Sequence, residues 1–426
     1  MKKAAFYTLG CKVNQYETQA VAEIFKEDGY QVVGFDEEAD VYVINTCTVT
    51  GFSDKKSRQM IRKARSISRQ AVVVAMGCYS QVAPEDVASL PEVDLIIGTK
   101  NRKKILEYIK ELKGTKINVV ETLENAKYES LDVSLNEGHT RATLKIQDGC
   151  NQFCSYCIIP YARGPARSRK AEDILEEAKR LADNGFKEIV LTGINLALYE
   201  GSFIEVAKSI SELESIQRIR IGSMEPSMVT EEFVELVANY PKLCPHFHIS
   251  LQSGCDATLK RMNRRYTSRE YWNAVELLKR RIKDVAVSTD VIVGFPGETD
   301  EEFSETYAFL DKLSLSKTHV FKYSARKGTA AAKFSGQISP MEKEKRSKSL
   351  IELSDRKARE FNFSFIGREM SVLFENSAAG IEGYLEGFTT NYIKVICQGD
   401  ENLRRKIVNV KLCEARDGYM QGELLC

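Results

Sequence analysis

Three cysteines close together in the chain are the strongest chemical signal in the sequence. Cys150, Cys154 and Cys157 form a Cys-x3-Cys-x2-Cys group directly after an apolar segment typical of a strand. Three thiolates on one loop can converge on a [4Fe–4S] cluster, whose four irons take four ligands, so one iron would stay open to a small molecule. Unliganded thiols and a structural zinc site are the alternatives, but zinc normally takes four protein ligands, and no fourth Cys or His lies nearby in the sequence.

A second set of thiols is widely spaced. Cys11, Cys47 and Cys78 each follow a short apolar run. The carboxyl ends of parallel strands meet at one edge of a sheet, and ligands bind beyond that edge. The placement therefore favours a site, although the residues alone leave three buried thiols as an alternative.

The segments that carry these cysteines predict two α/β regions. Over residues 1–120, apolar runs alternate with helical stretches, which predicts a parallel α/β sheet domain. Residues 121–138 are polar and acidic and predict a linker. Six strand–helix repeats follow, and a domain over 139–362 is expected to form a partial (β/α)6 barrel rather than a closed eight-stranded one. Residues 363–426 show short alternating runs between Gly, Asn and Asp, which predict a small antiparallel β-barrel.

Bulk properties narrow the class of protein. An odd number of cysteines, 11, in a chain with no export signal argues against a disulfide framework and for metal binding or ordinary buried thiols. No apolar run is long enough to span a bilayer, so we expect a cytoplasmic protein with no membrane association. The net charge of +1 conceals basic clusters, which the sequence places at 55–69, 163–170 and 260–269.

The residues around the first cysteine group carry a family resemblance. The segment DGCNQFCSYCIIPYARGPARSR resembles the radical S-adenosylmethionine methylthiotransferases. The resemblance implies that Cys150, Cys154 and Cys157 bind a [4Fe–4S] cluster whose open iron chelates S-adenosylmethionine, which is then cleaved to a 5′-deoxyadenosyl radical. It also implies a set of cofactor-binding residues at or near strand ends: Tyr156, Gly193, Asn195, Glu225 and Gln252.

The opening of the chain extends the resemblance. TLGCKVNQYET is similar to the start of this family, which implies a second [4Fe–4S] cluster on Cys11, Cys47 and Cys78 that delivers the sulfur. S-adenosylmethionine would then serve as radical source and as methyl donor. Beyond the cluster ligands, no catalytic residue is assigned. The implied partners are a tRNA anticodon stem-loop, a low-potential electron donor and a sulfur source.

The carboxyl-terminal barrel resembles the TRAM domain, a small RNA-binding module, with one departure. From residue 364 onward it carries seven Lys or Arg against nine Asp or Glu. Phosphate contacts are therefore expected from a local face, from the basic helix after Cys47 or from the segment Arg163–Lys170.

Three substrates are known in the family: isopentenyladenosine in tRNA, a ribosomal-protein aspartate, and threonylcarbamoyladenosine at position 37 of tRNA. The segment from Leu9 to Glu17 most resembles the third branch, so we expect methylthiolation at C2 of that adenosine, by analogy alone. A non-catalytic iron–sulfur RNA-binding protein is a rival from another class.

The remaining candidate ligands show no spacing typical of a metal site. We expect five cysteines to lie in the core or at the surface, namely Cys244, Cys255, Cys397, Cys413 and Cys426. We expect structural roles for the four histidines, namely His139, His246, His248 and His319.

Overall fold

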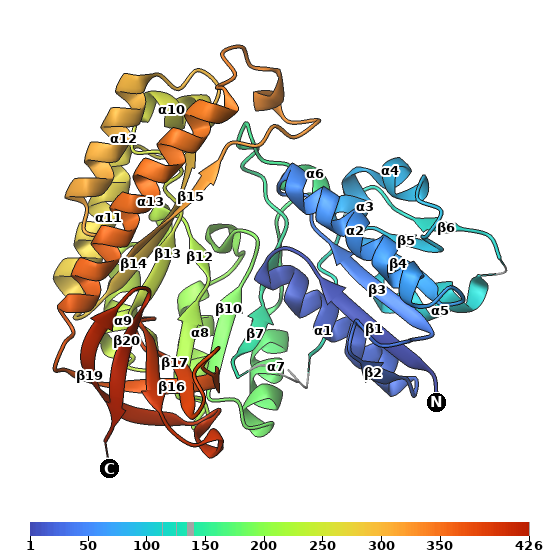
Figure 1. Cartoon of the computed structure of the whole chain (residues 1–426), viewed down its shortest axis with the longest axis horizontal. Coiled ribbons are helices and arrows are strands. Elements are labelled where there is room, and N and C mark those ends of the chain that lie inside the picture. Colours follow the sequence, from blue (N-terminus) through green and yellow to red (C-terminus); the bar gives the residue numbers. More distant parts are fainter. Residues whose placement is uncertain (113, 125, 134–139, 426) are drawn as a thin grey trace.

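The chain forms three parts, as the sequence predicts: a parallel α/β sheet, a partial barrel and a small closed β-barrel (Figure 1). The computed structural model describes all residues except 113, 125, 134–139 and 426. Among the described residues, no helix is both long enough and apolar enough to cross a membrane. The predicted fold class is confirmed.

The amino-terminal sheet has six parallel strands in the order β2-β1-β3-β4-β5-β6. Their bounds are β1 (Lys3–Thr8), β2 (Gln31–Val33), β3 (Val41–Thr46), β4 (Val72–Gly77), β5 (Leu95–Ile97) and β6 (Ile117–Val119). The two edge strands, β2 and β6, were not predicted, because each has only three residues, of which none is fully buried. The three strands that precede cysteines, β1, β3 and β4, are direct neighbours.

Helices cover both faces of this sheet. One face packs on α1 (Lys12–Glu27) and α5 (Ile105–Glu111). The other packs on α2 (Gly51–Ile67), α3 (Cys78–Val82) and α4 (Pro84–Ala88). Successive strand residues serve opposite faces, as Ala4 and Ala5 of β1 do, so the buried strands are apolar almost throughout.

The central barrel is open and consists of two short sheets in series. Their orders are β11-β10-β7 and β12-β13-β14-β15, and only Gly222 separates β11 from β12. The strands are β7 (Ala142–Lys145), β10 (Glu188–Thr192), β11 (Arg218–Ile221), β12 (Ser223–Met224), β13 (His246–Ile249), β14 (Ala286–Val293) and β15 (Lys317–Lys322). The predicted six-repeat partial barrel is confirmed.

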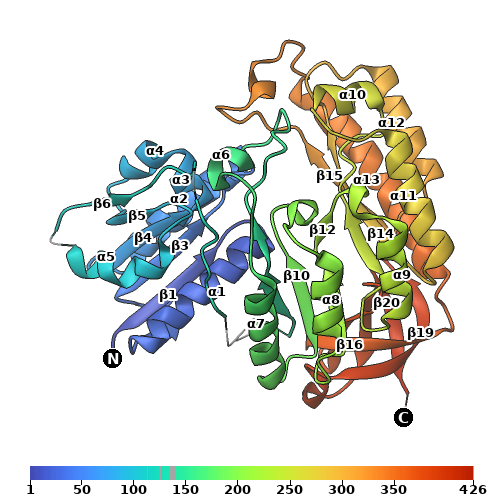
Figure 2. The same ribbon diagram turned by 180° about the vertical axis from the view of Figure 1, so that it is seen from behind.

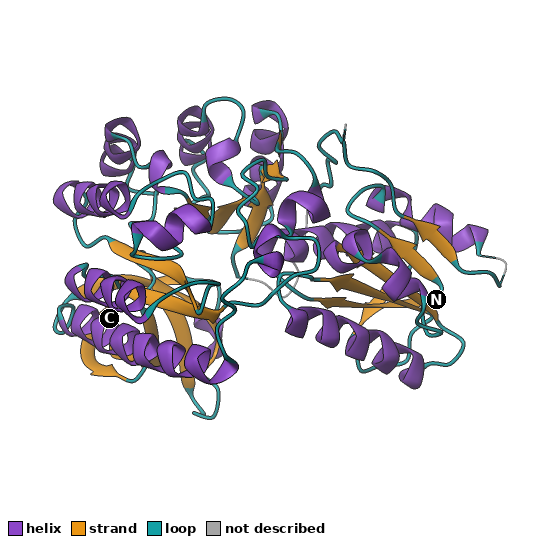
Figure 3. Cartoon of the chain, turned by 90° about the horizontal axis from the view of Figure 1, so that it is seen from above, coloured by secondary structure: helices purple, strands orange, loops and turns teal. Residues whose placement is uncertain are grey.

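Helices line the outside of this barrel (Figures 2 and 3). They are α7 (Ala171–Asp183), α8 (Phe203–Ser211), α9 (Glu231–Asn239), α10 (Asp256–Arg261), α11 (Ser268–Arg281) and α12 (Asp300–Lys312). Both α11 and α12 begin with a capping box, in which Thr267 or Thr299 exchanges hydrogen bonds with the Glu three residues later. A long helix, α13 (Pro340–Phe363), packs on β15 and leads out of the barrel.

The carboxyl-terminal part closes in the order β16-β17-β18-β20-β19. Its strands are β16 (Glu369–Ser377), β17 (Tyr384–Thr389), β18 (Lys394–Gln398), β19 (Ile407–Arg416) and β20 (Tyr419–Leu424). The pairing is antiparallel except between β18 and β20, which run parallel where the barrel closes. Buried Arg218 of β11 donates to the Phe388 carbonyl of β17 at 2.9 Å, which fixes this module on the central barrel.

The predicted linker has little regular structure where it is described, but it packs tightly. Leu131 and Val133 are buried against Tyr16 and Ala20 of α1. These apolar side chains, spaced by two along a polar segment, fill the seam between the sheet domain and the barrel.

A buried carboxylate joins the amino-terminal domain to the barrel. Glu17 of α1 is fully buried and bonds Arg102 at 2.6 Å, Lys145 of β7 at 2.8 Å and Arg163 at 2.8 and 3.0 Å. Burial alone would raise the pKa of Glu17, but these three cations hold it well below its usual range. The neighbouring Asp148 accepts hydrogen bonds from Lys145 at 2.7 Å and from Arg163 at 2.9 Å.

Replacement of this carboxylate should loosen the interface. In Glu17→Gln, three buried cations lose their shared counter-charge, and removal of one partner of a buried ion pair costs about 3–5 kcal/mol. We expect a fall of that order in the free energy of unfolding, measured by urea denaturation of the cluster-free protein. Glu27→Gln, on an exposed position of the same helix, is the control and should change it by less than about 0.5 kcal/mol. Equal effects of both changes would contradict this role.

The same contact has a definite pH signature. The pKa of Glu17 is lower in the folded than in the unfolded chain, where it is about 4.5. The carboxylate therefore stabilises the fold above pH 4.5 and loses this contribution as the pH falls further. The stability difference between the wild type and Glu17→Gln should be largest near pH 7 and should shrink below about pH 4. A difference that is constant from pH 7 to pH 3 would exclude a charge effect.

Candidate functional site

The three clustered cysteines lie on one loop beyond the carboxyl end of the first barrel strand. The loop runs from β8 (Gln147–Asp148), after the first barrel strand, to α6 (Ile159–Arg163). Cys150, Cys154 and Cys157 all line a cavity of about 140 Å³. The sequence placed these thiols after a strand, and the structure brings them together around one space.

Three of the five predicted cofactor residues line the same cavity. Tyr156, Asn195 and Glu225 come from the cysteine loop, from the turn after β10 and from the turn after β12. The Asn195 amide nitrogen lies 3.9 Å from the Cys150 sulfur. Side chains from three different barrel segments therefore surround the thiols.

The other two predicted residues, Gly193 and Gln252, do not line the cavity. A Cβ added to Gly193 would lie 2.9 Å from the Gln147 side chain, whose Oε1 accepts a hydrogen bond of 2.8 Å from the Asn195 backbone nitrogen. This glycine thus allows the approach that positions Asn195. Gln252 has a φ of 70° and joins the loop after β13 to β14, through a backbone hydrogen bond of 2.8 Å to Asp290.

Sequence reasoning missed Gln152 and Arg264. The Arg264 guanidinium lies 3.2 Å from the Cys154 sulfur and 3.1 Å from Glu225, and its side chain is 6% exposed. Gln152 donates to the other oxygen of Glu225 at 2.7 Å. The sequence showed Arg264 only as a member of a basic cluster, because its partners lie far away along the chain.

The three thiols of this cavity are the groups that could hold a metal cluster. Burial raises the pKa of Cys157 to about 12 and raises that of Cys150, and the thiols raise each other's pKa further. As ligands they must be thiolates, which need a positive centre beside them. Gln152 also has a buried Oε1 with no hydrogen-bond partner in the described part of the chain. Within the same described part, no three His, Cys, Asp or Glu side chains are arranged to hold a single ion. The donor set fits a [4Fe–4S] cluster, in which each thiolate binds a different iron.

The second cysteine set lies on the amino-terminal sheet. Cys11, Cys47 and Cys78 follow the adjacent strands β1, β3 and β4 at their carboxyl ends. A Cβ added to Gly10 would lie 3.0 Å from both Cβ and Sγ of Cys47. Burial raises the pKa of Cys78 to about 12, with further contributions from the other two thiols. The three thiols thus lie within electrostatic range of one another.

One asparagine ties this set to the barrel. Asn14 donates to the carbonyls of Leu9 at 2.7 Å and Thr46 at 3.2 Å, which precede two of the cysteine positions. Its side-chain oxygen accepts from Arg163 at 2.7 Å. Arg163 ends α6, directly after the barrel cysteine loop, so a single side chain links the two thiol sets.

The predicted role of the segment Arg163–Lys170 in phosphate binding is wrong for its three arginines. Arg163, Arg167 and Arg169 are all nearly fully buried, and each pairs with a carboxylate. Because their charges are already compensated inside the protein, they cannot meet an RNA backbone.

The remaining cysteines lie in the core or near the surface, as expected, where they are described, and His246, His248 and His319 line a cavity of about 860 Å³. Cys244, Cys255 and Cys397 are buried, and Cys413 is half-buried. His246 stacks on Tyr392 at 4.7 Å, and His248 lies 3.2 Å from Asp290. Cys426 and His139 lie outside the described residues.

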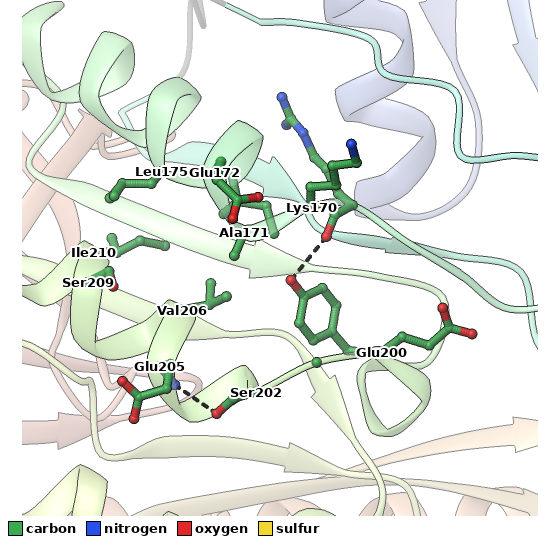
Figure 4. Close-up of a pocket in the computed structure, with 14 residues that line it drawn as sticks. Lys170, Ala171, Glu172, Leu175, Glu200, Ser202, Glu205, Val206, Ser209 and Ile210 are labelled. Atoms are coloured by element: carbon green, nitrogen blue, oxygen red, sulfur yellow. Dashed lines mark hydrogen bonds between the residues drawn. The ribbon is translucent and has the colours of Figure 1, made fainter.

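A separate cavity of about 470 Å³ lies between α7 and α8 on the outside of the barrel (Figure 4). It is lined by Lys170, Glu172 and Glu205 among others, and Tyr199 donates to the Arg169 carbonyl at 3.0 Å. None of the predicted cluster or cofactor residues lines it, so it is not part of the cysteine site.

Comparison with known proteins agrees with this architecture. Residues 144–310 match the model of the radical SAM superfamily, and residues 3–98 match uncharacterized protein family UPF0004. The threonylcarbamoyladenosine tRNA methylthiotransferase MtaB of Bacillus subtilis is 44% identical, over 100% of this chain and 97% of that protein. The chain belongs to the radical S-adenosylmethionine methylthiotransferase family. Family membership implies a [4Fe–4S] cluster and S-adenosylmethionine at the barrel site.

Two further matches are less similar to this methylthiotransferase. The tRNA-2-methylthio-N(6)-dimethylallyladenosine synthase of Syntrophus aciditrophicus is 33% identical over 98% of the chain and 94% of that protein. Among solved structures, the radical S-adenosylmethionine methyltransferase TsrM of Kitasatospora setae aligns with a TM-score of 0.55 and 16% identity, covering 75% of each chain. That likeness shows the fold alone.

The arginine beside Cys154 should tune the barrel cluster. Removal of a nearby cation makes addition of an electron less favourable, since cluster potentials depend on local charge and on hydrogen bonds to sulfur. We expect Arg264→Gln to lower the midpoint potential by on the order of 100 mV, the equivalent of one charged hydrogen bond. Redox titration followed by electron paramagnetic resonance measures it. Arg265→Gln, at the exposed neighbouring position, is the control, and an equal shift in both variants would refute the assignment.

Proposed function

We propose that this methylthiotransferase inserts a methylthio group at C2 of N6-threonylcarbamoyladenosine at position 37 of tRNA. One observation carries the proposal: the two cysteine sets belong to domains that a buried ion pair, Glu17–Arg163, holds together. The name of the Bacillus subtilis relative supports the substrate. The relatives that act on dimethylallyladenosine are less similar, at 33–34% identity.

Six cysteines are the proposed metal ligands in this function. Cys150, Cys154 and Cys157 would hold the barrel cluster, with Tyr156, Asn195 and Glu225 beside S-adenosylmethionine. Cys11, Cys47 and Cys78 would hold a second [4Fe–4S] cluster, and three thiols without a fourth leave the corner that a sulfur carrier needs. When bound, the barrel cluster and S-adenosylmethionine would supply the 5′-deoxyadenosyl radical, and the second cluster would supply the sulfur.

The protein itself would position the target nucleotide relative to the two cysteine sets. A cavity of about 860 Å³ is lined by Gly10 next to Cys11, by barrel residues and by residues of the β-barrel. Ser223 lines both this cavity and the smaller one that contains the barrel cysteines. A nucleotide in the large cavity would therefore lie next to both thiol sets, as transfer of a group between two centres requires.

Exposed cations on α2 are the proposed contacts with tRNA phosphates. Lys55, Arg62 and Lys63 are exposed on this helix, which follows Cys47. Arg62 and Lys63 also form ion pairs with Glu92 and Asp36, but unlike the buried arginines they stay accessible to solvent. Phosphate contacts of this kind position a nucleic acid without reading its sequence. The anticodon stem-loop would lie across α2 and the TRAM-like barrel, and an electron donor and a sulfur source would complete the reaction. The predicted domain bounds, 1–120, 139–362 and 363–426, are part of this proposal.

A steric change at the second site should remove one cluster. Gly10→Ala places a Cβ 3.0 Å from Cys47 and should displace it. Iron per chain after anaerobic reconstitution should fall from about eight to about four, the content of one [4Fe–4S] cluster. Gly29→Ala is the matched control, because its φ of +85° is also left-handed but nothing lies within 4 Å of the added Cβ. Full iron content in Gly10→Ala would contradict a cluster at this site.

The substrate is tested by nucleoside analysis. In a strain that lacks this gene and any paralogue, mass spectrometry of tRNA digests should show no 2-methylthio-threonylcarbamoyladenosine, with its unmethylthiolated precursor retained. The wild-type gene should restore it, whereas Cys154→Ala should not, because the open-iron site is lost. Persistence of the methylthio nucleoside in the deletion strain would exclude this substrate, and loss of the dimethylallyl counterpart instead would assign the chain to the other branch.

A further inference from the structure

The large cavity contains one cation without a partner. Four basic side chains line it: Lys12, Arg220, Lys317 and Lys394. Carboxylates hold three of them, Arg220 through Glu188 at 2.8 Å, Lys317 through Asp355 at 2.8 Å and Lys394 through Glu386 at 2.7 Å. Lys12 alone makes no hydrogen bond or ion pair with the residues that the structure describes, and it is open to solvent within the cavity.

The acidic groups of the cavity do not compensate this charge. Asp290 is the carboxylate among the described lining residues, and it lies 3.2 Å from Nε2 of His248. The first turn of α1, which begins at Lys12, contains no acidic residue, and the Cys11 side chain does not cap it. Free backbone N–H groups at a helix start add positive potential next to the lysine ammonium. This wall of the cavity therefore carries a positive charge that none of the described lining residues compensates, and it could bind an anion from a ligand.

The position of Lys12 fits a particular part of the proposed substrate. In adenine, C2 and C6 both flank N1, so a group held next to the sulfur-accepting carbon also lies near the N6 substituent. Lys12 directly follows Cys11, one of the proposed sulfur-site ligands. A threonylcarbamoyl group on N6 ends in a carboxylate, whereas a dimethylallyl group has no charge.

We propose that Lys12 binds the carboxylate of the amino acid on N6 of the target adenosine and so selects an adenosine that carries this anion. The inference rests on the proposed function, and it adds the residue that distinguishes charged from neutral N6 groups. A charge-assisted contact in this cavity can discriminate between the two groups, since binding of an uncharged N6 group would leave the ammonium of Lys12 unpaired.

Binding of two anticodon stem-loops tests the contact, with threonylcarbamoyladenosine or plain adenosine at position 37. Anaerobic fluorescence anisotropy on the reconstituted enzyme should show about tenfold tighter binding of the first, as expected of one charge-assisted hydrogen bond. Lys12→Met should abolish this preference, and Lys12→Arg should keep most of it. Lys317→Met, on the carboxylate-paired lysine of the same cavity, should affect both loops alike.

A tRNA phosphate is the other anionic oxygen group that could meet Lys12. If Lys12→Met weakens both loops equally, the lysine contacts the backbone and the inference is overturned. It is also overturned if the preference survives in Lys12→Met.

A third stem-loop tests the same contact with unaltered protein, which avoids any effect of the variant on Cys11. In this loop the threonine carboxylate is replaced by a carboxamide, and the wild type should bind it as weakly as the unmodified loop. Equal binding of the carboxylate and carboxamide loops would refute the role of the anion. A wild-type enzyme that prefers the carboxylate loop but forms no methylthio product would instead refute the proposed function.

Discussion

The architecture depends on one buried carboxylate that three cations share. Glu17 comes from α1, whose amino end follows Cys11, and two of its partners, Lys145 and Arg163, come from the barrel. Burial of any of these charges alone would be prohibitive, so each side of the interface needs the other to compensate it. The amino-terminal domain is therefore docked in one register, and Figure 1 shows α1 beside β7 as a result.

This docking determines how the two cysteine sets are placed relative to each other. Arg163 bonds both Glu17 and Asn14, and Asn14 holds the backbone before Cys11 and Cys47. An error in the angle of α6 would thus be transmitted to both thiol sets. If both cysteine sets hold clusters, as proposed, group transfer between them would lose much of its rate when they are misplaced by about 1 Å, and an ion-pair network fixes their placement better than a flexible linker would.

The sequence predicted what depends on local pattern. Apolar runs that end in cysteines located β1, β3 and β4, and spacing alone grouped Cys150, Cys154 and Cys157. It could not predict that Arg163 is buried, because its partner Glu17 is 146 residues away, and so a basic cluster was interpreted as an RNA surface. The contact of Arg264 with Cys154 could not be predicted for the same reason, because the two residues are 110 positions apart in the sequence. The six cysteines remain predicted ligands. The shared cavity of one set and the adjacent strand ends of the other support this prediction, and sequence spacing alone could not give either.

The proposed radical reaction needs few titratable side chains in the two cavities. Burial, with Arg220 nearby, holds the pKa of His246 well below its usual range, so this ring in the large cavity stays neutral. Acid–base catalysis works best with a pKa near the working pH, and a weakly acidic C–H bond gives such a group nothing to remove. In the proposed function, a radical made in the small cavity would need only a short path to a substrate in the large one. Ser223 lines both cavities, and Lys12 lines the large cavity.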